Sequence, residues 1–151
     1  MMTNSHFMHE ALLQAEKASQ ADEVPVGAVV VHRATGEVIS EAHNEVEKWG
    51  DATAHAEMLA IRRATEKIGS KSLKGYDLYV TLEPCPMCAT AISFARIDRV
   101  YFGAYDPKSG GVEHGPRIFN SSSCHHAPEI YGGIMESECA EMLKSFFVDK
   151  R

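Results

Sequence analysis

Apolar residues recur along the chain with two spacings, one typical of helices and one typical of strands. Between residues 1 and 21 they recur every three or four positions, which predicts an amphipathic helix; they are Phe7, Ala11, Leu12, Ala15 and Ala18. The next apolar stretches, 24–31 and 38–43, are rich in β-branched residues and have the length of strands. Because Ala34-Thr35-Gly36 between them is typical of a turn, we expect a hairpin.

Helix and strand patterns alternate through the middle of the chain. A helix is predicted over 54–68, with Thr53 as its N-cap and Gly69 at its end. Two short apolar runs then predict buried strands, and prolines at the start of the segment between them favour a helix there. These three elements are expected at 78–82, 100–104 and about 86–95.

The last third of the chain begins with a polar segment. Residues 106–128 are rich in Gly, Ser, Pro and His, which predicts a long surface loop, and loops of this length are often functional. A closing helix is predicted over 136–150, with an apolar side made of Cys139, Met142, Leu143, Phe146 and Phe147. Strands that alternate with helices indicate an α/β fold, with the first hairpin antiparallel and the later strands parallel.

Length and composition set limits on what the chain can be. Its 151 residues fit one domain over 1–151, and 44% hydrophobic with 24% charged residues is typical of a globular protein. No apolar run is long enough to cross a membrane. The net charge of −6 excludes a basic coat for nucleic acid, so that an RNA partner would need a local basic patch. No secretory signal is visible at the N-terminus, so we expect a cytoplasmic protein with reduced cysteines.

Histidine and cysteine side chains with metal-ligand spacing occur in two short fragments, each just before a predicted helix. The first contains His55 and the second contains Cys85 and Cys88. Two cysteines three positions apart can direct both sulfurs to one point, and a helix N-terminus lowers the pKa of a thiol. One nitrogen and two sulfur donors leave the fourth tetrahedral position open, as in catalytic zinc sites. The sequence therefore predicts one zinc ion.

Glu57 makes this zinc site a candidate for catalysis. It lies two positions after His55, close to the metal without having to be a ligand. Zinc lowers the pKa of water to about 7. A carboxylate beside that water can carry its proton to a substrate, which contributes typically about 10²–10⁴-fold to a rate. We therefore predict that Glu57 is the catalytic proton shuttle.

Each fragment alone also has an ordinary explanation. A C-x-x-C pair occurs in thioredoxin-like redox proteins, and a histidine before a helix is often a cap or a core residue. A zinc-binding scaffold without catalysis would use the donors but would have no use for Glu57. The combination of H-x-E with a later P-C-x-x-C is more specific, because it is typical of zinc-dependent nucleobase deaminases.

Most of the chain between residues 23 and 147 resembles the bacterial tRNA-specific adenosine deaminases, a family of zinc deaminases. The matching stretches are DEVPVGAVV (22–30), AHAE (54–57), LYVTLEPC (78–85), RI (96–97), FGAYDPKSG (102–110) and SFF (145–147). The resemblance implies a three-layer α/β/α fold of the cytidine-deaminase type with a mixed, roughly five-stranded sheet. It also implies one zinc ion per subunit, a homodimer, and deamination of adenosine to inosine at the wobble position of an arginine tRNA anticodon.

The same resemblance implies roles for individual residues. His55, Cys85 and Cys88 would bind zinc, and Glu57 would transfer protons. The implied substrate-binding residues are Asn44, which would hydrogen-bond the base; Ala56 (through its backbone N–H), Pro25, Val26, Leu82 and Pro84, which would form the pocket walls; Asp106 and Lys108, which would hold ribose and phosphates; and Phe146. For Phe146 and Phe147 a place in the core is an alternative.

Three features leave room for other interpretations. The zinc pattern is equally compatible with a deaminase of a free base or nucleoside such as guanine, cytosine or cytidine. The chain has Ala52 where the family usually has proline, which affects the loop beside the site rather than the ligands. Cys124, His125 and His126 are adjacent, but three consecutive side chains rarely point at one ion, so we expect a loop without metal there.

Overall fold

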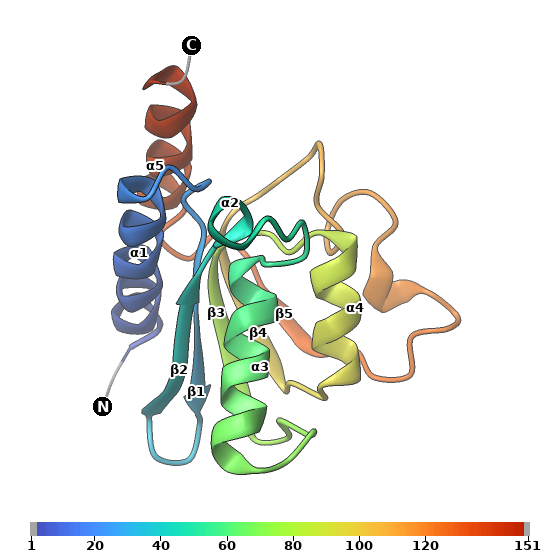
Figure 1. Cartoon of the computed structure of the whole chain (residues 1–151). Helices are drawn as coiled ribbons and strands as arrows, with labels where there is room; N and C mark the ends of the chain where they lie inside the picture. Colours follow the sequence, from blue (N-terminus) through green and yellow to red (C-terminus); the bar gives the residue numbers. More distant parts are fainter. Residues whose placement is uncertain (1–2, 150–151) are drawn as a thin grey trace.

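The computed structural model describes residues 3–149 and has a mixed five-stranded sheet between two layers of helices (Figure 1). The strand order is β2-β1-β3-β4-β5, which confirms the predicted three-layer α/β/α fold. The helices are α1 (Asn4–Gln20), α2 (Val46–Trp49), α3 (Ala56–Ile68), α4 (Pro86–Phe94) and α5 (Glu136–Asp149). The strands are β1 (Gly27–His32), β2 (Glu37–His43), β3 (Tyr76–Leu82), β4 (Arg99–Ala104) and β5 (Glu129–Tyr131).

The sheet changes from antiparallel to parallel at β3. Strand β1 pairs antiparallel with both β2 and β3, whereas β3, β4 and β5 run parallel to one another. Parallel neighbours require crossover connections, and α4 provides the one between β3 and β4. The ends of β3 and β4 therefore meet at one edge of the sheet, where chain segments leave toward α4 and toward residues 105–114.

Alternate residues of the strands build two separate cores, one on each face of the sheet. Leu78, Val80 and Phe102 pack on the face covered by α3 and α4. Tyr79 and Tyr101 pack on the opposite face, under α1 and α5 (Figure 1). This alternation follows from the two-residue period of a strand, and it explains why the three central strands β1, β3 and β4 are mostly apolar.

Two glycines allow α1 and α5 to lie very close to the sheet. A Cβ atom at Gly27 of β1 would lie 2.0 Å from the backbone oxygen of Ala11 in α1. A Cβ atom at Gly103 of β4 would lie 2.3 Å from Sγ of Cys139 in α5. Both distances are far below van der Waals contact, so a larger residue at either position would displace the helix.

Several predicted boundaries need correction. Strand β1 begins at Gly27 rather than at Val24, because residues 24–26 turn away from the sheet toward a cavity. Helix α3 begins at Ala56, and Thr53 is not its N-cap: the Thr53 hydroxyl and backbone N–H both donate to Asp51 Oδ1. The short helix α2 was not expected from the sequence.

The C-terminal third also differs in part from the expectation. Strand β5 was not anticipated as a separate element, because its three residues are too few to show a period. The predicted loop 106–128 is not wholly on the surface, since residues 110–112 are buried. In α5 Cys139 is buried as expected, but Phe147 is 50% exposed, so the helix presents aromatic surface where a core side was predicted. Lys150 lies outside the described residues. Among residues 3–149, no helix has the length and apolar character needed to cross a membrane.

Candidate active site

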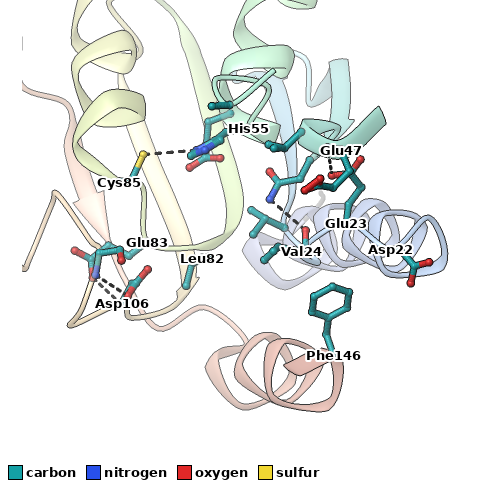
Figure 2. A pocket seen from close by; sticks show the side chains of 16 residues that line it. Asp22, Glu23, Val24, Glu47, His55, Leu82, Glu83, Cys85, Asp106 and Phe146 are labelled. Atoms are coloured by element: carbon teal, nitrogen blue, oxygen red, sulfur yellow. Dashed lines mark hydrogen bonds between the residues drawn. The ribbon is translucent and has the colours of Figure 1, made fainter. Parts of the chain in front are cut away.

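A cavity of about 680 Å³ opens at the end of the sheet where β3 stops and α3 and α4 begin (Figure 2). The 22–26 segment and α2 form one side of it, and α5 closes part of the mouth. The lining residues include His55, Glu57 and Cys85, together with Val24, Val26, Asn44, Leu82, Asp106 and Phe146.

Three metal-donor side chains predicted from the sequence come together in this region. His55 precedes the first residue of α3 and Cys85 precedes the first residue of α4, while Cys88 lies in the first turn of α4. Nδ1 of His55 lies 3.6 Å from Sγ of Cys85 and 3.5 Å from Sγ of Cys88. All three donor atoms lie within 4.8 Å of one another, which is the arrangement needed to bind one metal ion.

The donor groups also influence one another's protonation. A hydrogen bond from Cys88 lowers the pKa of Cys85 to about 4, and His55 stabilises the same thiolate. The pKa of Cys88 is raised, because Cys88 holds the proton shared with Cys85 and is buried beside it. The pKa of His55 is raised above its ordinary value chiefly by its hydrogen bond with Cys85. The cluster thus attracts positive charge, which a divalent cation would supply.

The chemistry of the donor set fits zinc. One imidazole nitrogen and two thiolate sulfurs are ligands that zinc prefers, and three protein ligands leave one coordination position for water or substrate. No fourth His, Cys, Asp or Glu belongs to this donor group in the described residues. The arrangement therefore matches a catalytic site rather than a closed structural site.

Glu57 lies in the first turn of α3 and is only 4% exposed. Burial raises its pKa to about 7, and this rise is the largest effect on the group. A carboxylate with a pKa near neutrality can both accept and return a proton at physiological pH. Glu57 lines the same cavity as His55 and Cys85, and its role as the proton shuttle stays a prediction.

Asn44 connects two walls of the cavity. Its Oδ1 accepts a hydrogen bond from the backbone N–H of Ala56 (2.7 Å), and its Nδ2 donates to the carbonyl oxygen of Val24 (3.1 Å). The Ala56 N–H was expected to face a bound base, but here Asn44 occupies it. Asn44 thus satisfies the first N–H of α3, which has no side-chain cap from His55.

The other predicted substrate residues fall into three groups. Val26, Leu82, Asp106 and Phe146 line the cavity, as do the Val24 and Glu83 neighbours of Pro25 and Pro84. Pro25 and Pro84 themselves are buried and are not among the lining residues. Lys108 is exposed and lies in a second depression of about 560 Å³, which shares Val24, Leu82 and Asp106 with the cavity.

Two buried carboxylates beside the cavity were not predicted. Glu23 accepts hydrogen bonds from the backbone N–H groups of Glu47 and Lys48 and thereby fixes α2 (Figure 2). Glu83 lies two residues before Cys85 and accepts from the backbone of Asp106, among other donors. Glu23 and Glu83 both belong to stretches that resemble the family. Acidic side chains are mostly exposed in proteins, so nothing in the sequence indicated that these two are buried.

Comparison with known proteins identifies the family. Residues 1–104 match the model of the cytidine and deoxycytidylate deaminase zinc-binding region. The chain is 54% identical to the tRNA-specific adenosine deaminase of Agrobacterium fabrum over 151 residues, which is 100% of this chain and 98% of that protein.

Solved structures agree with this assignment. One from a study of A-to-I editing by tRNA:A34 deaminases at the wobble position superposes with a TM-score of 0.89 at 55% identity, covering 92% of this chain and 99% of that chain. The guanine deaminase of Nitrosomonas europaea has a TM-score of 0.86 at 19% identity, covering 98% of this chain and 86% of that one, which shows a shared fold only. The chain therefore belongs to the zinc-binding cytidine and deoxycytidylate deaminase family and, within it, to the tRNA-specific adenosine deaminases.

Proposed function

We propose that this protein is a zinc-dependent hydrolase that converts adenosine to inosine at the wobble position of a tRNA anticodon, with an arginine tRNA as its substrate. The observation that carries the proposal is the cavity in which His55, Cys85 and Cys88 converge beside the buried Glu57. The high identity to tRNA-specific adenosine deaminases over the whole chain supports adenosine in tRNA as the substrate.

In this mechanism His55, Cys85 and Cys88 hold one zinc ion per subunit. The bound ion supplies Lewis-acid chemistry, since it lowers the pKa of water to about 7. Glu57 accepts a proton from the attacking water and delivers it to N1 of adenine while the water oxygen adds to C6. Glu57 then takes the proton of the new C6 hydroxyl and passes it to the departing amino group, so that the C6–N6 bond breaks and water and adenosine give inosine and ammonia.

The cavity walls would hold the target base. Val26, Leu82 and the neighbouring Pro25 and Pro84 segments form apolar sides, while Asn44, whose Oδ1 accepts the Ala56 N–H, provides the polar group. Because Asn44 is engaged with Ala56 and Val24, hydrogen bonding to the base would use its remaining lone pair and N–H. Bases in an anticodon loop are already partly unstacked, so moving one into the cavity costs only a few kcal/mol.

The mouth of the cavity would contact the rest of the nucleotide. Asp106 lies on the rim, and Lys108 lies in the adjoining depression, where ribose and phosphate groups can be reached from the base. Phe146 points from α5 toward the cavity (Figure 2) and would pack against the substrate. Since the chain carries a net charge of −6, few phosphate contacts are available, and the affinity would fall with salt only as steeply as those few contacts allow.

The proposal extends to the assembly and location of the protein. Residues 1–151 would act as one deaminase domain, because α1 and α5 pack on the same sheet that carries the donors. We further propose a homodimer in the cytoplasm, as the family resemblance implies for an enzyme that acts on tRNA. Sedimentation of the zinc-loaded protein tests the dimer directly.

The decisive experiment compares substrates. Zinc-loaded protein is incubated with an arginine-tRNA anticodon stem-loop and, separately, with guanine, cytosine and cytidine, and the products are measured by mass and by inosine-specific digestion. Inosine at the wobble base alone supports the proposal. Release of ammonia from a free base with unchanged RNA would overturn the substrate, and zinc binding without any ammonia release would overturn the enzymatic function.

A further inference from the structure

Glu83 is a fully buried carboxylate that the mechanism does not use. It follows β3 and precedes the metal donor Cys85 by two residues, and its side chain has no exposed surface. Burying a charged group costs several kcal/mol unless hydrogen bonds replace the lost water. The structure therefore has to supply donors for both oxygens.

The donors all come from one segment, residues 106–114. Oε2 accepts from three consecutive backbone N–H groups, those of Val112 (3.2 Å), Glu113 (3.0 Å) and His114 (3.2 Å). Oε1 accepts from the backbone N–H of Asp106 (3.0 Å) and lies 2.8 Å from Nδ1 of His114. Successive N–H groups that converge in this way form an anion-binding concavity, and here the anion is a side chain of the same protein.

The fit between Glu83 and this segment is close. A Cβ atom at Gly110 would lie 2.3 Å from Oε2 of Glu83, so only glycine leaves room for the carboxylate there. A further backbone bond, from the N–H of Gly111 to the carbonyl oxygen of Pro84 (2.8 Å), ties the same two segments together. The 106–114 segment is thus fastened to the short connection that carries Cys85.

The fastened segment contributes to the substrate side of the cavity. Asp106 lines both the cavity and the adjoining depression, and Ser109 lines both as well. Lys108 lies between these two residues in the sequence and faces the depression. Asp106 and Ser109 do not belong to a helix or strand, because the segment between β4 and the 3-10 helix Ile118–Asn120 contains neither.

We propose that Glu83 is a positioning residue that holds the substrate-facing 106–114 segment against the metal-donor turn. This inference rests on the proposed function, since it assigns residues 106–109 to nucleotide binding. Loss of the Glu83 carboxylate should release the segment and weaken substrate binding. Metal binding should be unaffected, because His55, Cys85 and Cys88 keep their own contacts.

The test uses the Glu83→Gln variant of the full-length, zinc-loaded protein. Glutamine has the same shape but offers an N–H₂ group to N–H donors, so that at least one side of the concavity loses its acceptor. We expect amide hydrogen exchange at Val112, Glu113 and His114 to become at least about tenfold faster. KM for the anticodon stem-loop should rise about 5–10-fold with kcat within about threefold of wild type, and zinc content should remain unchanged.

The matched control is Ser40→Ala. Ser40 donates its hydroxyl to the carbonyl oxygen of Ala60 (2.7 Å), also within the protein interior, but it lies on β2 outside the cavity. This variant should lower the melting temperature without changing KM or exchange in residues 106–114. Loss of zinc in Glu83→Gln, unchanged exchange in the segment, or equal KM shifts in both variants would overturn the proposal.

A second variant keeps the proposal testable if Glu83→Gln does not fold. His114→Ala removes one donor and leaves the four backbone bonds, so exchange at 112–114 should rise and KM should increase about two- to threefold with zinc retained. No change in either quantity would contradict the proposal. If the wild-type protein does not deaminate the RNA, the proposed function fails, while the exchange data still decide whether Glu83 holds the segment.

Discussion

The metal-donor side of the cavity and the side formed by residues 106–114 and α5 differ in how they are held in place. His55 and Cys85 lie at the starts of α3 and α4, two helices that contact each other and whose buried residues share one core with the strands. The other side consists of an irregular segment fastened by Glu83 and of the part of α5 that carries Phe146, where the helix extends past the sheet (Figure 1).

This difference in structural support suggests a division of roles between metal binding and substrate binding. A metal site tolerates only small errors in donor position, and regular elements set such positions more accurately than loops do. The residues of α5 near the cavity mouth are instead largely exposed, and we propose that they contact the RNA. Substitutions on the first side should therefore affect zinc and kcat, and those on the second side should affect KM.

The largest expected effect is loss of the metal. Cys88→Ala removes one of three donors, so zinc content should fall from one ion per chain to less than about a tenth, and deamination should be abolished. Cys139→Ala is the control, since Cys139 is equally buried but lies on α5 against Gly103. It should retain zinc and lose about 1 kcal/mol of stability. Metal analysis and thermal unfolding decide, and full zinc in Cys88→Ala would contradict the assigned donor set.

Loss of the proton shuttle should be nearly as severe. Glu57→Gln preserves shape and zinc content but cannot accept a proton, so kcat should fall about 10²–10⁴-fold while KM changes little. Single-turnover assays on the stem-loop RNA measure the effect, with zinc content as the control. Appreciable turnover at normal zinc content would show that Glu57 is not the proton shuttle. It would also contradict the expectation that substitutions on the metal-donor side lower kcat.

On the side formed by residues 106–114 and α5, the two phenylalanines of α5 should affect KM to different extents. Phe146 lines the cavity, whereas Phe147 is 50% exposed and lines the adjoining depression. Contact between an aromatic side chain and a base is worth about 1–3 kcal/mol. We expect Phe146→Ala to raise KM about tenfold and Phe147→Ala about twofold, both with normal zinc. A larger effect for Phe147 would place the base in the depression instead.

The smallest expected effect is a loss of stability on the metal-donor side of the cavity, at Glu45. Glu45 accepts from Trp49 Nε1 (2.9 Å) and lies 3.4 Å from Arg63 of α3. Burial acts to raise its pKa, but Trp49 and the neighbouring cations outweigh burial, so the pKa is below its ordinary value. The resulting stability is present above the unfolded pKa of about 4.3 and is lost as pH falls through the lower folded value.

The effect of Glu45→Gln on stability should therefore depend on pH. The variant should be about 1 kcal/mol less stable than wild type at pH 7, and the gap should narrow as the pH falls below about 4. Urea unfolding across this range measures both chains under the same conditions. A gap that widens toward acid would show that the Glu45 charge destabilises the fold, contrary to this reasoning.

Local chemical signals explain what the sequence could predict. Gly69 ends α3 and Pro86 begins α4 as expected, because these residues act through their own backbone preferences. His55, Cys85 and Cys88 were predictable as a set, since their spacing at helix starts is itself the requirement for metal binding. The layered arrangement followed from the alternation of strand and helix patterns.

Features that depend on distant partners could not be predicted in the same way. Glu23 and Glu83 are buried only because backbone N–H groups far away in the sequence converge on them. Strand β5 forms because β4 presents an edge to it, rather than because Glu129–Tyr131 has a strand pattern of its own. Phe147 has the spacing of a core residue, yet α5 projects beyond the sheet that would have covered it.

The glycines under α1 and α5 have a consequence for redesign of the cavity. Because Gly27 and Gly103 already let both helices rest against the sheet, neither helix can move inward to narrow the cavity for a smaller base. Any larger residue at these positions would act as a spacer that pushes a helix outward, and with α5 it would carry Phe146 away from the mouth. A library aimed at new nucleobases would therefore keep these two glycines constant and vary the residues along the mouth.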